Sequence, residues 1–275
     1  MSRGLGDVYK RQVKELSTID SKPARNTVAE CYTEIISDLK NSTELLSGDF
    51  NKGKVNRWAA MTLLSRVYLY KGEYNEALTM AENAIKGAEK EGYALWTNEE
   101  YPTAWGNDAS ASNPGEILFE IVNLTTDSPG KESMGYLNSY NGYDDMCITC
   151  SFYQLLKKDP KDVRLKILSF DKKYYAYVNK YQPQQGENIT DANIPLIRLS
   201  EAYLNAAEAA VQTGDNAKAV KYLNSIVQRA NPENSVEGKT LTLENVLDER
   251  RKELVAEGHR MYDVIRNLSL IHISE

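Results

Sequence analysis

Residues 55–85 constrain the fold more than any other part of the chain, because their sequence predicts two amphipathic helices joined by a tight turn. Apolar residues recur near helical spacing in both halves of this stretch, and alanines are frequent in the second half. Small residues let two helices approach closely, and Gly72 supplies the backbone freedom that a tight turn needs. Such a hairpin cannot bury both of its faces alone, so this stretch predicts further elements that pack on it.

A second stretch, residues 194–230, repeats the pattern around Gly214. Aligning Gly214 with Gly72 brings small and apolar positions into register: Ala219 with Ala77, Leu223 with Ala81 and Ile226 with Ala84. A repeat of this kind, with small residues at the helix crossing, is typical of tetratricopeptide hairpins. We expect its first helix to begin at Ile194, and we predict flanking helices over residues 27–46 and 243–267.

Residues 87–193 separate the two hairpins and are mostly irregular, with many tyrosines and polar residues. Within them we predict short strands over residues 116–122 and 172–178, and one or two helical turns over residues 151–157. A loop-rich segment of this length inside a compact domain usually has a function. The sequence therefore predicts a mainly α fold, in which tetratricopeptide-like helical hairpins carry a long irregular insertion with a few short strands.

The composition argues against several classes of function. A formal net charge of −6 disfavours a basic nucleic-acid-binding surface, and no apolar run approaches the roughly 20 residues of a membrane-spanning helix. Only two histidines are present, and the single C-x-x-C pair, Cys147 and Cys150, has no second pair with which to hold zinc. These cysteines form either a pair of free thiols or one local disulfide. We expect no catalytic residue, no metal and no cofactor.

The two ends of the chain differ in character from the rest. Residues 1–12 contain neither the apolar core of a signal peptide nor a clear helix start, and residues 268–275 follow the last predicted helix as a short apolar stretch. We interpret both segments as non-native sequence. The domain that we predict therefore covers residues 13–267, with the insertion at about 87–193.

Several segments together resemble the SusD/RagB family, the outer-membrane glycan-binding lipoproteins of Bacteroidetes. The first marked helical pair of that family is similar to RWAAMTLLSRVYLYKGEYNEALTMAENAI, and its second marked helix is similar to IPLIRLSEAYLNAAEAAVQTGD. Its closing signature, ERRxEL followed by EGxRxxD, is similar to LDERRKELVAEGHRMYDVIRN. The resemblance covers roughly residues 13–267, and the segments occur in the family's order.

The resemblance implies a non-catalytic function. It implies that the protein binds an oligosaccharide or polysaccharide at the bacterial cell surface and delivers it to a TonB-dependent outer-membrane transporter for nutrient uptake. It also implies a lipoprotein of the cell outer membrane, and we expect the family's signal peptide, lipidated cysteine and long N-terminal region to be missing from this chain. Two alternatives stay open. A tetratricopeptide protein-interaction module predicts contiguous repeats, and a glycoside hydrolase needs two facing carboxylates.

The insertion holds the mixture of side chains that binds sugars. Aromatic rings stack on the C–H faces of a sugar, while amide and carboxylate groups meet its hydroxyls. The candidate glycan-binding residues are Trp96, Tyr101, Trp105, Tyr136, Asn138, Tyr140, Asn141, Tyr143 and Asp144. In the alternative interpretation, the aromatic residues only pin the long loops to the helices.

Structural roles are expected for five further residues. Gly72 and Gly214 close the two hairpins. The family resemblance implies that Arg251 and Glu253 tie the last helix to the repeats, and that Arg260 in the same signature is structural.

The acidic residues of the last helix follow one another at a four-residue spacing. Glu249, Glu253 and Glu257 are interleaved with arginines. Residues at this spacing are neighbours on a helix surface, where an ion pair contributes a few tenths of a kcal/mol. We therefore predict a charged helix face with ion pairs, and not an active site.

Overall fold

The computed structural model describes residues 25–51, 53–106, 114–139, 141–143, 145–171, 175–183 and 188–267. The chain divides into two units, Met1–Ile35 and Ile36–Glu275. Of the described elements, only the start of helix α2 (Val28–Leu45) lies in the first unit, and the others lie in the second. The mainly α fold class is confirmed. The segments 1–12 and 268–275, which we interpreted as non-native, lie outside the described residues.

Both predicted hairpins are present. The first consists of α3 (Arg57–Lys71) and α4 (Tyr74–Lys90), and the second of α7 (Leu199–Gln212) and α8 (Asn216–Ala230). Asn56 begins α3, because its side chain accepts a hydrogen bond from the backbone N–H of Ala59 at 2.9 Å. Gly72 and Gly214 have φ angles of 81° and 78°, which side chains other than glycine rarely adopt. The two glycines therefore permit the tight turns.

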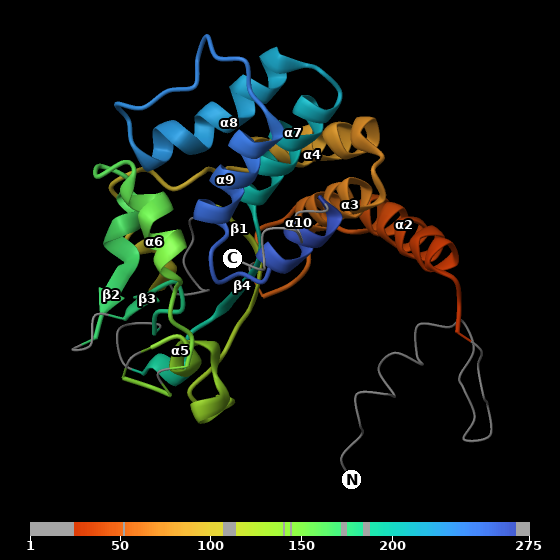
Figure 1. Cartoon of the computed structure of the whole chain (residues 1–275). Helices are drawn as coiled ribbons and strands as arrows, with labels where there is room; N and C mark the ends of the chain where they lie inside the picture. Colours follow the sequence, from red (N-terminus) through yellow and green to blue (C-terminus); the bar gives the residue numbers. More distant parts are fainter. Residues whose placement is uncertain are drawn as a thin grey trace, which may run out of the picture. The chain divides into compact units, whose positions relative to one another are not determined.

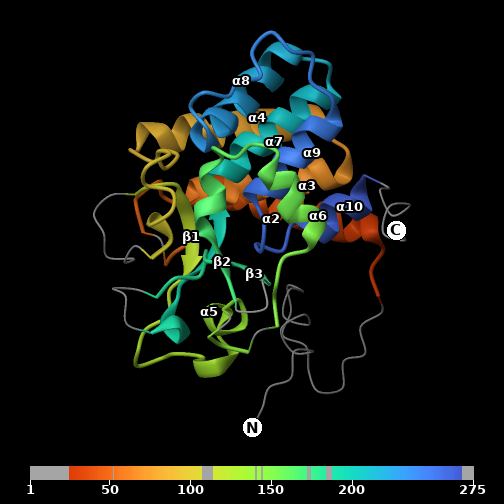
Figure 2. The ribbon, with the colours of Figure 1, turned by 60° about the vertical axis from the view of Figure 1, so that its left-hand side comes forward.

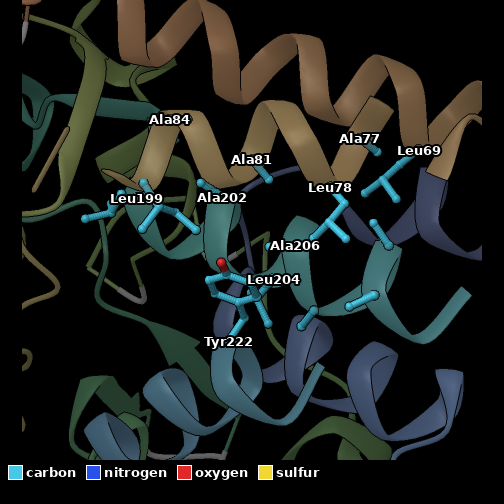
Figure 3. Close-up of a cluster of buried hydrophobic side chains, with 14 of the residues drawn as sticks. Leu69, Ala77, Leu78, Ala81, Ala84, Leu199, Ala202, Leu204, Ala206 and Tyr222 are labelled. Carbon is cyan, nitrogen blue, oxygen red and sulfur yellow. The ribbon is translucent and has the colours of Figure 1, made fainter. Parts of the chain in front are cut away.

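The two hairpins are contiguous in space, although the insertion separates them in the sequence. Helix α3 packs on α4, α4 on α7 and α7 on α8, and α4 lies beside α7 in both Figure 1 and Figure 2. Figure 3 shows the α4–α7 contact, where fully buried alanines from both helices meet: Ala77, Ala81, Ala84, Ala202 and Ala206. Because these side chains are small, the two helices pack closely and form one helical stack.

The segment that we predicted as the start of the second hairpin is a strand. Residues Ile194–Arg198 form β4, which pairs antiparallel with β1 (Ile117–Ile121), the strand predicted at 116–122. The backbone N–H of Leu199 donates to the carbonyl of Glu116 at 2.8 Å, and α7 begins there. Pro195 disfavours the helical conformation of the residue before it, and β1 supplies hydrogen-bond partners that a local pattern does not reveal.

The single last helix that we predicted over residues 243–267 is wrong. Two helices replace it, α9 (Leu243–Glu253) and α10 (Arg260–Arg266). Between them, Ala256 and Gly258 have positive φ angles of 64° and 80°, which a right-handed helix cannot contain. Gly258 adopts this conformation without steric cost, so it is the residue that permits the break.

The part of the insertion around α5 (Met134–Leu137) lies at one end of the second unit, whereas α6 (Cys150–Lys157) and β1 lie beside the helical stack. In both views of the ribbon, its short helix α5 is far from α8, with the β1–β4 sheet between them (Figure 1, Figure 2). Besides β1, its elements are the 3₁₀ helices η1 (Ala104–Gly106), η2 (Gly130–Glu132), η3 (Val163–Ile167) and η5 (Ile189–Asp191), the α-helices α5 and α6, and the strands β2 (Leu168–Phe170) and β3 (Ala176–Val178). The predicted helical turns at 151–157 are confirmed by α6. The strand predicted at 172–178 is confirmed only at β3, since 172–174 are outside the described residues. Among the helices that the structure describes, none combines the length and apolar character needed to cross a bilayer.

A largely buried ion pair joins the first helix of one hairpin to the first helix of the other. Arg66 of α3 donates through Nε and Nη2 to the two carboxylate oxygens of Glu201 on α7, at 2.5 Å and 2.6 Å. Burial opposes the ionised form of Glu201, but the charge and hydrogen bonds of Arg66, together with smaller contributions from His259 and Arg250, outweigh it and lower the pKa of Glu201 from 4.5 to about 2. The folded state therefore favours the carboxylate more strongly than the unfolded chain does.

This pair predicts how stability depends on pH. Because the pKa is lower in the folded state, the contribution of Glu201 is complete above about pH 4.5 and is lost as the pH falls towards 2. We expect the Arg66→Gln variant to be less stable than the natural sequence by on the order of 2 kcal/mol at pH 7, and this difference to shrink steadily below pH 4.5. Urea denaturation between pH 2 and 7 measures it. A difference that stays constant across this range would contradict the assignment.

Candidate functional site

A buried network of charged side chains joins the helical stack to the insertion. Glu253 of α9 is fully buried and lies within ion-pair distance of three arginines. The distances are 2.7 Å to Arg229 on α8, 3.1 Å to Arg198 on β4 and 3.3 Å to Arg164 on η3. Burial opposes ionisation of Glu253, but these arginines outweigh it and hold the pKa of the carboxyl well below its usual range.

The network extends beyond Glu253. Arg198 also pairs with Glu257 and with Glu116, which directly precedes β1, and Lys180 donates to Glu257 at 2.6 Å. We use the term buried charge network for Glu116, Arg164, Lys180, Arg198, Arg229, Glu253 and Glu257. Its members come from six different segments of the insertion and the helical stack, so it fixes their positions relative to one another.

The prediction of a charged surface face on the last helix is wrong. Glu249 and Glu253 are 4% and 0% exposed, and Arg250 between them is 0% exposed. Apart from Lys252, which pairs with Glu249 within α9 at 2.5 Å, their partners lie on other elements, so the four-residue spacing does not describe the pairs that form. Arg164, far away in the sequence, pairs with both Glu249 and Glu253.

Of the two adjacent arginines in the signature, Arg250 links α9 to α7 and α10, whereas Arg251 links α9 to α6. Arg250 Nη1 donates to Asn205 Oδ1 of α7 at 2.8 Å, and its guanidinium pairs with Asp263 of α10 at 3.2 Å. Arg251 points elsewhere and donates to Ser151 Oγ of α6 at 3.0 Å. Successive residues of a helix point in different directions, and the pattern does not show which of the two faces the core. Arg260 is exposed and forms no ion pair within the described part of the chain.

Three aromatic candidates for sugar binding are buried. Trp96, Tyr101 and Trp105 are 5%, 0% and 4% exposed, and their rings meet edge to face at 4.9–6.2 Å. The Trp105 ring lies 4.8 Å from both Lys180 Nζ and the Arg198 guanidinium. These rings cover the buried charge network and offer no face to a ligand. Their burial favours the alternative interpretation, in which they pin the loop to the scaffold.

A second group of candidates does come together at the surface. The rings of Tyr136 and Tyr143 meet edge to face at 5.0 Å, and Tyr143 remains 44% exposed. The backbone N–H of Tyr143 donates to the carbonyl of Tyr136 at 3.3 Å, and its hydroxyl donates to Glu132 at 3.4 Å. Tyr140 and Asp144, two further candidates, lie outside the described residues. We call Tyr136 and Tyr143 the tyrosine pair.

A polar pocket of about 420 Å³ lies close to the tyrosine pair, whose neighbours in the chain, Gly135 and Asn141, line it although the two tyrosines do not. The predicted residues Asn138 and Asn141 line it, together with Asn179 and Gln182, which the sequence analysis missed. The only local sequence feature that pointed to Asn179 and Gln182 was a run of polar residues directly after a predicted strand. The lining of the pocket is rich in amide side chains, which suit a ligand that has many hydroxyl groups, and the half-exposed ring of Tyr143 lies just outside this lining, two residues along the chain from Asn141.

Close packing between the short helices α5 and η5 maintains the shape of this pocket. Ser133 begins α5 by accepting a hydrogen bond from the Tyr136 N–H at 3.2 Å, and Gly135 then faces η5. A Cβ atom at Gly135 would lie 2.0 Å from the carbonyl oxygen of Ile189, so only glycine allows this approach. The position of Asn138, at the end of α5, depends on the same contact.

The structure also shows the state of the cysteines and of the buried histidine near this pocket. Cys147 and Cys150 are both free and exposed, so of the two alternatives the unbridged one holds. His259 is buried, and burial lowers its pKa below the ordinary value. Across the described ranges, no three His, Cys, Asp or Glu side chains gather as a metal site would require.

The fold and the site together define a class: a tetratricopeptide-like scaffold with a polar pocket built in its insertion. The family model described as the SusD family matches residues 116–271, and one described as starch-binding associating with outer membrane matches residues 5–69. Because the first match covers more than half of the chain, the chain belongs to the SusD family.

Known relatives agree with this assignment. A SusD-like protein of Bacteroides ovatus is 24% identical over 281 residues, which cover 87% of this chain and 51% of that protein. The starch-binding protein SusD of Bacteroides thetaiotaomicron is 35% identical over 94 residues, covering 34% of this chain and 16% of the relative. A SusD superfamily protein of Bacteroides vulgatus has a similar structure, with a TM-score of 0.82 and 39% identity over 89% of this chain and 56% of that one. The chain spans about half the length of the first of these relatives.

Proposed function

We propose that this protein binds a glycan at the bacterial cell surface without cleaving it and hands it to a TonB-dependent outer-membrane transporter. Membership of the SusD family supports glycan binding, and the description of the second family model supports association with the outer membrane. A lipid anchor would hold the protein there. Both the transporter and the anchor are inferred from the family.

The observation that carries this proposal is the polar pocket next to the tyrosine pair. Amide groups of Asn138 and Asn141 can exchange hydrogen bonds with sugar hydroxyls, while the exposed face of Tyr143 can stack on a sugar ring. The described lining of the pocket includes no carboxylate, whereas glycoside hydrolysis needs a pair of them. This supports binding without cleavage.

One observation favours protein binding as a second candidate function. The α3, α4, α7 and α8 helices form the contiguous stack that a tetratricopeptide interaction module requires. The two functions are compatible, since delivery to a transporter also needs a protein contact. If the protein bound its transporter but no glycan, only protein binding would remain as its function.

The test is calorimetric titration of the chain with a panel of oligosaccharides, combined with an assay for newly released reducing ends. We expect binding and no release. Tyr143→Ala should weaken binding about tenfold, because one stacked aromatic ring contributes about 1 kcal/mol beyond its buried area.

The control is Tyr175→Ala, which removes another tyrosine of the same insertion, 52% exposed, that is not part of the tyrosine pair. We expect this variant to bind as the natural chain does. Release of product, or an equal loss of affinity in both variants, would contradict the proposed function.

A further inference from the structure

A second pocket adjoins the polar pocket and has a different chemistry. Its volume is about 310 Å³, and Asn138 and Val178 line both pockets. Its walls are largely apolar and include Leu254 and Val255. Two arginines, Arg251 and Arg260, also line it. We call this second pocket the arginine pocket.

The two arginines carry positive charge that the described residues do not neutralise at close range. Arg251 is half-buried, donates to Ser151 Oγ, and has its guanidinium 6.0 Å from the Phe152 ring. Arg260 is exposed, and within the described ranges neither arginine has a carboxylate within ion-pair distance. Asp248 attracts Arg251 only from farther away.

The surroundings of these arginines favour an added negative charge. Burial, and then the charge of Arg260, lower the pKa of Arg251 below its ordinary value, so the two guanidinium groups repel each other. Arg250 and Asp263 also line the pocket, but they are paired with each other at 3.2 Å. His259 is buried there, and burial lowers its pKa as well. An anion placed between Arg251 and Arg260 would relieve the repulsion.

We propose that the arginine pocket is a subsite for an acidic sugar, whose carboxylate binds Arg251 and Arg260 while the next sugar of the chain lies in the polar pocket. Guanidinium groups bind carboxylates through strong, charge-assisted hydrogen bonds. The apolar walls suit the C–H face of a sugar ring, and the shared lining residues Asn138 and Val178 show that the two pockets adjoin. This inference rests on the proposed function and names its substrate class, a uronic-acid-containing glycan.

The experiment compares two ligands that differ only in charge, tetragalacturonic acid and its fully methyl-esterified form. The acid should bind the chain at least tenfold more tightly than the neutral ester. Arg251→Gln and Arg260→Gln should each weaken binding of the acid about tenfold and leave binding of the ester unchanged. Lys161→Gln is the control, because it removes an exposed positive charge, 63% exposed, outside the pocket lining.

The cysteines supply a readout at the site itself. Cys147 lines the arginine pocket and Cys150 does not, and both are free and exposed. In chains that keep only one cysteine, a saturating concentration of the acid should slow alkylation of Cys147 by maleimide and leave alkylation of Cys150 unchanged. Equal protection of both thiols would contradict binding of the acid in the arginine pocket.

The outcomes separate this inference from the proposed function. Equal affinity for the acid and the ester, or for neutral glucan oligosaccharides only, would overturn the acidic subsite and leave glycan binding intact. Failure to bind any glycan would overturn both. Binding of polyglutamate as tight as binding of the acid, with the same loss in both arginine variants, would show that the pocket recognises acidic peptides instead.

Discussion

The Glu253→Gln variant should lose about 3–5 kcal/mol of unfolding free energy, because it leaves three buried arginines without their shared carboxylate. Glutamine has nearly the same shape and keeps a hydrogen-bonding group, so the change removes charge and little else. Glu253 is fully buried, and Arg164, Arg198 and Arg229 all lie within 3.3 Å of it. Their charges would repel one another in a site that water cannot screen. Urea denaturation at pH 7 measures the loss.

The same substitution at Glu233 is the matched control. Glu233 pairs with Lys161 at 2.5 Å, but the two side chains are 69% and 63% exposed. Exposed pairs contribute between zero and about 1 kcal/mol, so Glu233→Gln should change stability by no more than that. If the two variants were equally stable, the buried charge network would not hold the insertion to the helical stack.

Replacing Gly135 with alanine should abolish measurable glycan binding and lower the unfolding free energy by about 3 kcal/mol. The added Cβ would lie 2.0 Å from the Ile189 carbonyl oxygen and 3.0 Å from the Ala192 Cβ. Neither neighbour is a flexible side chain, so α5 and η5 must move apart, and overpacking of this kind costs about 1–3 kcal/mol. Asn138 and Ile189 line the polar pocket from these two elements, so the pocket would lose its shape.

Gly130→Ala tests whether this effect is specific. Gly130 precedes α5 in the same loop, and an added Cβ there would meet nothing within 4 Å. Its φ angle of 62° limits the cost to backbone strain of about 1–2 kcal/mol. We expect this variant to keep its glycan affinity in calorimetric titration. Loss of binding in both variants would mean that the loop tolerates no change, and that the Gly135 contact has no special role.

The helical hairpins were predictable from the sequence because helix formation depends on residues three and four apart. Gly72 and Gly214 marked both turns, and the spacing of alanines marked the faces that pack. Helix α7 was misplaced at its start because Ile194–Arg198 forms a strand that pairs with β1. The paired residues of the two strands are 73–81 positions apart in the sequence. A local pattern carries no record of such a partner.

The residue types of the candidate site were predictable from the sequence, but the directions in which their side chains point were not. Tyr136, Asn138, Asn141 and Tyr143 were predicted and do gather beside one pocket. Trp105 belongs to the same class of residue but is buried against Lys180 and Arg198. Whether an aromatic ring faces a ligand or a buried cation depends on which segments pack around it, and these come from elsewhere in the chain.

The sequence by itself determined the two helical hairpins, their turns, the loop-rich insertion and the family, since each of these is expressed in short spacings or in a linear order of motifs. Only the tertiary structure decided that the split hairpins form one stack, that Arg250 and not Arg251 faces α7, and that Glu253 is buried among arginines. The physical reason is the range of the interactions. Arg198 reaches Glu116 across 82 positions and Glu253 across 55, and no spacing within one helix encodes those distances.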